Sequence, residues 1–246
     1  MDQRIAHIGN ANVVVRGDAD LKYSTNQLIV PGPTTGEQPA GRQNPQREKD
    51  EDPRPVRILL LGANPEDSPQ LRQDVEAREI ESKLRGSKHR ERFSFHSRLA
   101  IRKNDLQTYL LDISPNIVQF SGHGRTGELY LEDGPVSADF LAQVFGALKG
   151  GIRCVILNAC YTREQAEAIA AEIECVIGMV GVIPDSAAID FSVSFYQALA
   201  YGENLHQAFK LGCAHLEREA ASAELLLAGK GDPSEVFFVK EGGGPQ

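Results

Sequence analysis

The sequence of 246 residues lacks a long apolar segment. None of its apolar runs approaches the ~18 residues that a helix needs to cross a bilayer. The first residues, Met1-Asp2-Gln3-Arg4, are not followed by an apolar stretch, so we expect no secretory signal. We therefore expect a protein that does not act at a membrane.

Cysteine is scarce as well. The four cysteines form no C-x-x-C pair, and no histidine accompanies them at zinc-finger spacing. We therefore expect no disulfide framework, no bound metal and no cofactor, and a reduced, cytoplasmic location. Cys154, Cys175 and Cys213 lie among apolar neighbours and are expected to be buried.

Basic residues are outnumbered by acidic ones. The sequence has 26 Lys and Arg against 34 Asp and Glu, which gives a formal net charge of -8 and a pI near 5.3. Proteins that bind nucleic acid normally carry a basic patch, so we expect no nucleic-acid partner. An apolar fraction of 41% and a charged fraction of 24% are typical of a soluble globular protein.

Composition divides the chain into four parts. Residues 1–30 are polar, with two short β-branched runs, and are predicted to form an interaction segment. Residues 31–55 are dense in Pro, Gly, Gln and charge and carry no aromatic residue, which predicts a disordered linker. Residues 56–240 have the pattern of a globular domain, and residues 241–246 that of a flexible tail.

Within the globular part, short apolar runs alternate with amphipathic segments. Strands are predicted at 56–61, 93–101, 117–121, 154–158, 176–180 and 236–239, with helices at 68–86, 104–111, 137–148, 162–173, 186–201 and 204–220. This order predicts an α/β domain with a mainly parallel sheet of about six strands and helices on both faces.

Two of these strands end in chemically reactive turns. The run Ile117-Val118-Gln119-Phe120 leads to His123, and Cys154-Val155-Ile156-Leu157 leads to Cys160. Because ligands of open α/β sheets bind at the carboxyl ends of the strands, we expect both side chains at one edge. A histidine beside a cysteine can act as the base that activates the thiol. The pair predicts a cysteine hydrolase.

The same turns contain donors for a developing oxyanion. Gly124 leaves its N–H unobstructed, and the N–H of Cys160 lies where a loop enters a helix. No residue that would orient His123 can be assigned from the sequence. The alternative reading is structural: a cysteine after an apolar strand is often a core residue, and His-Gly is a common turn.

Residues 56–240 resemble a CHAT domain, the caspase-like peptidase module of the caspase/separase clan, of the bacterial type. The resemblance rests on four motifs in order: residues 117–124, 155–160, 176–179 and 185–191. It implies a caspase-hemoglobinase fold and peptide-bond hydrolysis, with His123 as the base and Cys160 as the nucleophile.

The resemblance also indicates where substrate would bind. In relatives that cut after basic residues, an acid two positions before the cysteine helps to line the specificity pocket, but this sequence has the neutral Asn158 there. Asp185 and Asp190 are candidates for an acidic pocket, although capping of the following helix is the favoured role for both. Asn64, after the first strand, is expected at the same edge as a substrate contact.

The amino-terminal segment contains a second motif. Residues 8–14, Ile-Gly-Asn-Ala-Asn-Val-Val, resemble the core of the RIP homotypic interaction motif and related bacterial amyloid-signalling motifs. Such segments stack in register, with Asn ladders along the fibril. Ala6 and His7 depart from the pattern, and a plain hairpin or a disordered leader is the alternative. The positions that match the motif are Ile8, Gly9, Asn12 and Val14.

Together these features predict a cysteine endopeptidase that cuts a protein substrate. Its control is expected to depend on recruitment or oligomerisation with a homotypic or heterotypic partner that carries a matching motif, in a bacterial defence or cell-death pathway. A catalytically silent CHAT-like adaptor is the first alternative. A nucleotide-binding domain is the second, and it is disfavoured because Gly62-Ala63-Asn64-Pro65 has a single glycine where a phosphate loop needs several.

Overall fold

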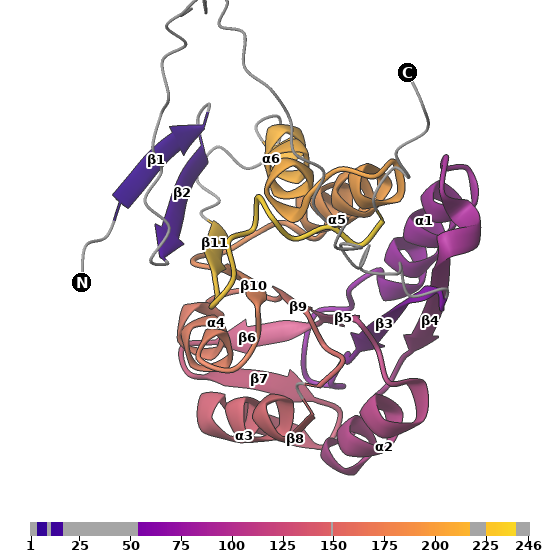
Figure 1. Cartoon of the computed structure of the whole chain (residues 1–246). Coiled ribbons are helices and arrows are strands. Elements are labelled where there is room, and N and C mark those ends of the chain that lie inside the picture. The colour runs from indigo at the N-terminus through magenta and orange to yellow at the C-terminus, as the bar shows by residue number, and fades with distance from the viewer. Residues whose placement is uncertain (1–3, 9–10, 17–53, 149, 217–224, 240–246) are drawn as a thin grey trace, which may run out of the picture.

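The computed structural model describes residues 4–8, 11–16, 54–148, 150–216 and 225–239. It contains an eight-stranded sheet with helices on both faces and a separate three-stranded sheet (Figure 1). None of the helices in these ranges is both long and apolar enough to span a bilayer. The predicted linker and tail lie almost entirely outside the described residues.

The eight strands follow the order β1-β2-β11-β10-β9-β5-β3-β4. All neighbouring pairs from β10 to β4 are parallel, β10 and β11 are antiparallel, β11 and β2 are parallel, and β1 and β2 are antiparallel. The bounds are β1 Arg4–Ile8, β2 Ala11–Arg16, β3 Val56–Gly62, β4 Phe93–Arg98, β5 Ile117–Ser121, β9 Cys154–Asn158, β10 Cys175–Met179 and β11 Leu225–Ala228. Six strands of this sheet follow residue 55, and they confirm the predicted α/β fold class.

Two layers of helices cover the sheet, one on each face (Figure 1). The first layer contains α1 (Gln73–Arg85), α5 (Asp185–Ala200) and α6 (Leu205–Leu216), and the second contains α2 (Lys103–Ile113), α3 (Ala138–Leu148) and α4 (Arg163–Ala170). A short 3₁₀ helix, η1 (Arg90–Arg92), precedes β4. The three-stranded sheet consists of β6 (His123–Arg125), β7 (Glu128–Leu131) and β8 (Gly134–Ser137).

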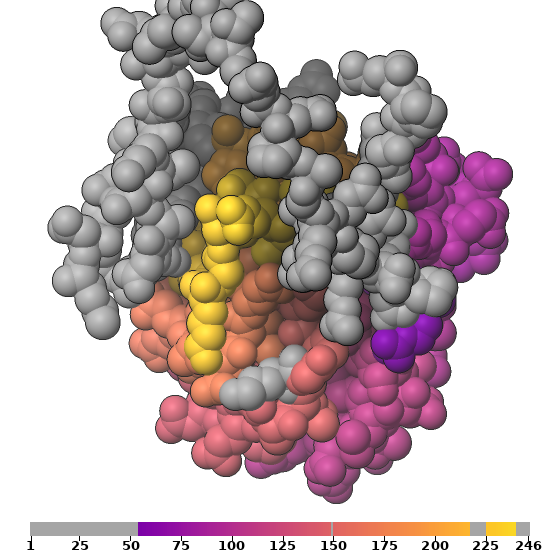
Figure 2. Space-filling view, viewed as in Figure 1, coloured from indigo at the N-terminus to yellow at the C-terminus, as the bar shows by residue number. Residues whose placement is uncertain are grey.

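The largest fully buried side chains of the core lie on α5 and α6. Phe191, Phe195, Tyr196 and Phe209 are fully buried and contact one another through stacked and edge-on rings. Gly212 lets the two helices approach, because a Cβ there would lie 2.7 Å from the Phe191 ring. The space-filling view shows the yellow C-terminal residues beside this layer (Figure 2).

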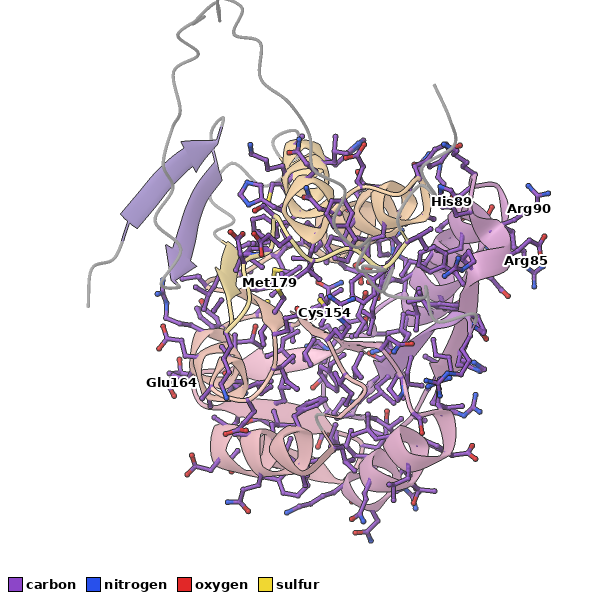
Figure 3. The ribbon with its side chains drawn as sticks, in the orientation of Figure 1. Arg85, His89, Arg90, Cys154, Glu164 and Met179 are labelled. Carbon is purple, nitrogen blue, oxygen red and sulfur yellow. The ribbon has the colours of Figure 1, made fainter. Side chains whose placement is uncertain are left out.

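Charged side chains at the far end of α1 lie at the periphery of the molecule (Figure 3). Figure 3 shows Cys154 in the interior, on the sheet, whereas Arg85 and Arg90 point outward from the far end of α1 and from η1. Helix α1 has Asp74 and Glu76 in its first turn and Lys83 and Arg85 in its last, which matches the helix dipole.

The prediction of a last strand at residues 236–239 was wrong. Val236, Phe238 and Val239 are buried, but the carbonyls of this segment bind elsewhere: Val236 O accepts from Leu205 N at 2.9 Å, and Phe237 O accepts from Arg153 Nη1 at 2.8 Å. The segment therefore has irregular structure, and its apolar side chains pack into the core. The strand that pairs with β10 is instead β11, whose four residues are all buried.

Two predicted helix starts also shift. Helix α1 begins at Gln73 rather than Ser68, so residues 68–72 form a loop above the sheet edge. Asn104 does not cap α2; the helix begins after Arg102, whose N–H donates to Asp105 Oδ2 at 2.9 Å.

Candidate active site

Strand register sets His123 and Cys160 at the same level. In the parallel pair of β5 and β9, Ser121 lies opposite Asn158. His123 and Cys160 each follow these partners by two residues, so both emerge at the carboxyl edge and at equal height. Gly122 N donates to Asn158 O at 3.2 Å and joins the two turns directly.

Gly124 brings the turns into van der Waals contact. A Cβ at this position would collide with the Cys160 carbonyl oxygen and would lie 3.3 Å from both Ala159 Cβ and Thr162 Cγ2. Only glycine permits this approach. The structure thus brings the predicted residues His123, Gly124 and Cys160 to one site.

A backbone carbonyl orients the imidazole. Nε2 of His123 lies 2.8 Å from Pro69 O. A carbonyl can only accept, so Nε2 carries the proton, and in the neutral ring Nδ1 is left as the acceptor. Sequence reasoning found no such partner, because every residue has a main-chain carbonyl and no sequence pattern indicates which carbonyl will accept from His123.

Asn64 holds the loop that presents Pro69. Its Nδ2 donates to Leu71 O at 3.0 Å, and its Oδ1 accepts from Leu71 N at 3.1 Å. Its own N–H donates to Glu132 Oε1 at 2.6 Å. Asn64 therefore closes the segment from 64 to 71, and its predicted contact with substrate stays a prediction.

The Cys160 thiol is partly exposed at the mouth of its turn. Its Sγ lies 3.9 Å from Ile183 O, at the distance of a weak S–H donor contact. Tyr161 follows with φ of 57°, a left-handed conformation that costs a side-chain-bearing residue ~1–3 kcal/mol. Hydrogen bonds to the end of β10 hold this conformation: Tyr161 N to Gly181 O at 3.2 Å and Thr162 N to Met179 O at 2.7 Å.

The other three cysteines differ sharply from Cys160. All three are buried, as predicted. Burial raises the pKa of Cys175 and of Cys213 to about 12, and it raises that of Cys154 well above its ordinary value. These three thiols therefore stay protonated near neutral pH and are poor nucleophiles.

A buried carboxylate lies beneath the two turns, and sequence reasoning missed it. Glu76 Oε1 accepts from Gln119 Nε2 and from Asn158 Nδ2, both at 2.7 Å. The side chains of Ser121 and Ser192 also donate to this carboxylate. Burial raises the pKa of Glu76, and the four hydrogen bonds oppose that rise in part.

The signal for Glu76 was present in the helix pattern. Gln73, Glu76, Ala77, Ile80 and Leu84 form the buried stripe of α1, so an acid occupies an inward-facing position. Asn158, predicted to contact substrate, belongs to this cluster and is buried.

The two aspartates of α5 do not cap the helix as expected. Pro184 occupies the N-cap without a side-chain bond, and Asp185 is the first helical residue. Its Oδ2 instead pairs with Arg72 Nε at 2.8 Å, across the starts of α1 and α5. Asp190 lies further along the helix, where it lines a groove of about 490 Å³ between α1 and α5. A role of either residue in substrate binding stays a prediction.

The amino-terminal motif lies at one edge of the eight-stranded sheet, whereas the site follows the central strands β5 and β9. Residues 4–8 and 11–16 form the β1–β2 hairpin, and residues 13–16 of β2 pair with β11. Ile8, Asn12 and Val14 lie in these strands, whereas Gly9 lies outside the described residues. Assembly of this segment into a fibril stays a prediction.

Comparisons with known proteins agree with this architecture. The model of the CHAT domain family matches residues 35–216. A relative named "Probable protease" from Gillisia limnaea is 26% identical over 153 residues, which cover 59% of this chain and 27% of the relative. The chain therefore spans about a quarter of that relative's length.

Solved structures show the fold. Caspase-1 from Spodoptera frugiperda superposes with a TM-score of 0.55 at 12% identity, over 86% of this chain and 100% of that one. A secreted C11 cysteine protease from Bacteroides thetaiotaomicron, in complex with an irreversible peptide inhibitor, gives a TM-score of 0.46 at 13% identity over 63% of this chain and 56% of that one. The fold is caspase-like, and the chain belongs to the CHAT domain family.

Proposed function

We propose that the protein is a cysteine endopeptidase in which Cys160 is the nucleophile and His123 the general base. The single observation that carries this proposal is the paired geometry of the two turns, with Nε2 of His123 donating to Pro69 O. That bond leaves Nδ1 free to take the thiol proton. The caspase-like fold and the family support the same assignment.

The reaction follows from these parts. Transfer of the thiol proton to His123 lets Cys160 Sγ attack the substrate carbonyl carbon, and the oxyanion accepts from the N–H groups of Gly124 and Cys160. Collapse of the tetrahedral adduct breaks the C–N bond, and the leaving amine takes the proton from His123. Water, deprotonated by His123, then attacks the thioester, which releases the carboxylic acid and restores the thiol.

Control through the amino-terminal hairpin is part of the proposal. A partner with a matching motif would gather copies of the enzyme and raise their local concentration, as in bacterial defence or cell-death systems. The support is the motif at residues 8–14, set on a segment far along the chain from the site.

The test compares the wild type with Cys160→Ala on a peptide library that varies the residue before the cleaved bond. Cys213→Ala is the matched control, because it removes a buried thiol on α6, an element that supplies none of the proposed catalytic groups. We expect cleavage by the wild type and the control and none by Cys160→Ala, with both free and artificially oligomerised protein. Absence of cleavage by all three proteins, whether free or oligomerised, would favour the adaptor function instead.

A further inference from the structure

The polar cluster below the two turns contains more acceptors than donors. It consists of Glu76, Gln119, Ser121, Asn158 and Ser192, which are between 0% and 5% exposed. Gln119 and Asn158 direct their amide NH₂ groups at Glu76, so their oxygens face elsewhere. Among the described residues, Gln119 Oε1 and Asn158 Oδ1 have no hydrogen-bond partner.

Such an arrangement is costly unless something binds it. A buried acceptor without a donor destabilises the fold, and a buried carboxylate favours a positive partner. The groups that bind Glu76 are amides and hydroxyls, which carry no charge. The complement of this site is therefore a cation with several N–H donors, as in an ammonium or a guanidinium group.

The cluster also has the right position for a substrate side chain. Ser121 and Asn158 are the last residues of β5 and β9, and His123 and Cys160 follow them by two residues. Cys160 packs against the buried cluster that contains residues of α1 and α5, the helices that supply Glu76 and Ser192. The polar cluster and the thiol therefore lie on the same side of the sheet, at its carboxyl edge. Asn158 Nδ2 also lies 3.3 Å from Ala188 O and from Ser192 Oγ, both on α5.

We propose that Glu76 is the acidic floor of the specificity pocket and selects a Lys or Arg immediately before the scissile bond. This proposal rests on the peptidase function proposed above. An incoming cation binds the Glu76 carboxylate, and the Asn158 amide turns so that its unpartnered Oδ1 accepts from the same group. Asp185 is a weaker candidate for this role, because Arg72 already neutralises it.

The experiment measures kcat/KM for fluorogenic peptides that differ only in the residue before the cleaved bond: Arg, Lys, Gln, Leu or Asp. The proteins are the full-length wild type, Glu76→Gln and Asp74→Asn, the last being an exposed acid in the first turn of α1 that serves as the matched control. We expect the wild type and Asp74→Asn to prefer Arg and Lys. Glu76→Gln should lower the ratio of Arg to Gln cleavage by about 30-fold or more, since it removes one partner of a buried ion pair.

The outcomes distinguish the failure of the Glu76 proposal from the failure of the peptidase proposal on which it rests. Efficient cleavage after Gln, Leu or Asp by the wild type would overturn the role of Glu76 while leaving the peptidase intact, and this readout needs no variant to fold. An unchanged Arg-to-Gln ratio in folded Glu76→Gln would do the same. Absence of cleavage of every peptide by oligomerised wild type would instead refute the peptidase, and the pocket with it.

Discussion

Replacement of Gly124 by alanine tests the contact between the two turns. The added Cβ would collide with the Cys160 carbonyl oxygen and press on Ala159 and Thr162. Backbone atoms on one side and a buried threonine on the other leave little room for relaxation. We expect an overpacking cost of ~1–3 kcal/mol, which corresponds to a fall in Tm of roughly 2–12 °C for a domain of this size.

The effect on catalysis should exceed the effect on stability. Separation of the turns moves the Cys160 sulfur and its N–H relative to His123, and a misplacement of ~1 Å can lower the rate by about 100-fold. Gly150→Ala is the control, because a Cβ there meets nothing within 4 Å. The assays are kcat/KM on the best peptide and thermal unfolding by circular dichroism. Wild-type activity in Gly124→Ala would refute the close contact as a requirement of the site.

Three further predictions concern the groups around the site. Iodoacetamide should modify the folded protein at Cys160 alone, as read by peptide mass spectrometry, because the other three thiols are buried; rapid labelling of a second cysteine would contradict this. Asn64→Ala should lower kcat by about tenfold or more, since it frees the loop that carries Pro69; unchanged kcat would show that the loop holds its place without Asn64. Protonation of Glu76 stabilises the fold fully below its unfolded pKa and ceases to do so as pH rises through its raised folded pKa. The stability of the wild type relative to Glu76→Gln, from urea unfolding, should therefore be greatest below the ordinary Glu pKa of about 4.3 and fall as the pH rises above it, and a rise would contradict the shift.

The sequence was sufficient for the fold class and for the positions of His123 and Cys160 after β5 and β9. Buried parallel strands have apolar runs that stand out, and strand ends fix where His123 and Cys160 emerge. The last strand could not be placed, because residues 225–228 and 236–239 are both short apolar runs. The choice between them depends on the long-range contacts that Val236 O and Phe237 O make with Leu205 and Arg153.

The surroundings of the site were less accessible to sequence reasoning. The orienting group of His123 is a main-chain carbonyl, which has no sequence signature. Asp185 was predicted to cap α5 because it lies at the helix start. Its carboxylate instead accepts a hydrogen bond from Arg72, which is 113 residues away in the chain. Glu76 was visible only as an acid in an apolar helical stripe, and its partners on β5, β9 and α5 meet it through tertiary packing.

Covalent trapping tests the central claim most directly. Wild type, Cys160→Ala and Cys213→Ala would each be mixed with a peptide p-nitrophenyl ester and quenched in acid for intact-mass spectrometry. We predict an acyl adduct on Cys160 in the wild type and in Cys213→Ala, released over time, and no adduct in Cys160→Ala. Turnover of the ester at an undiminished rate by Cys160→Ala, or an adduct on another residue, would contradict the assignment of Cys160 as the nucleophile.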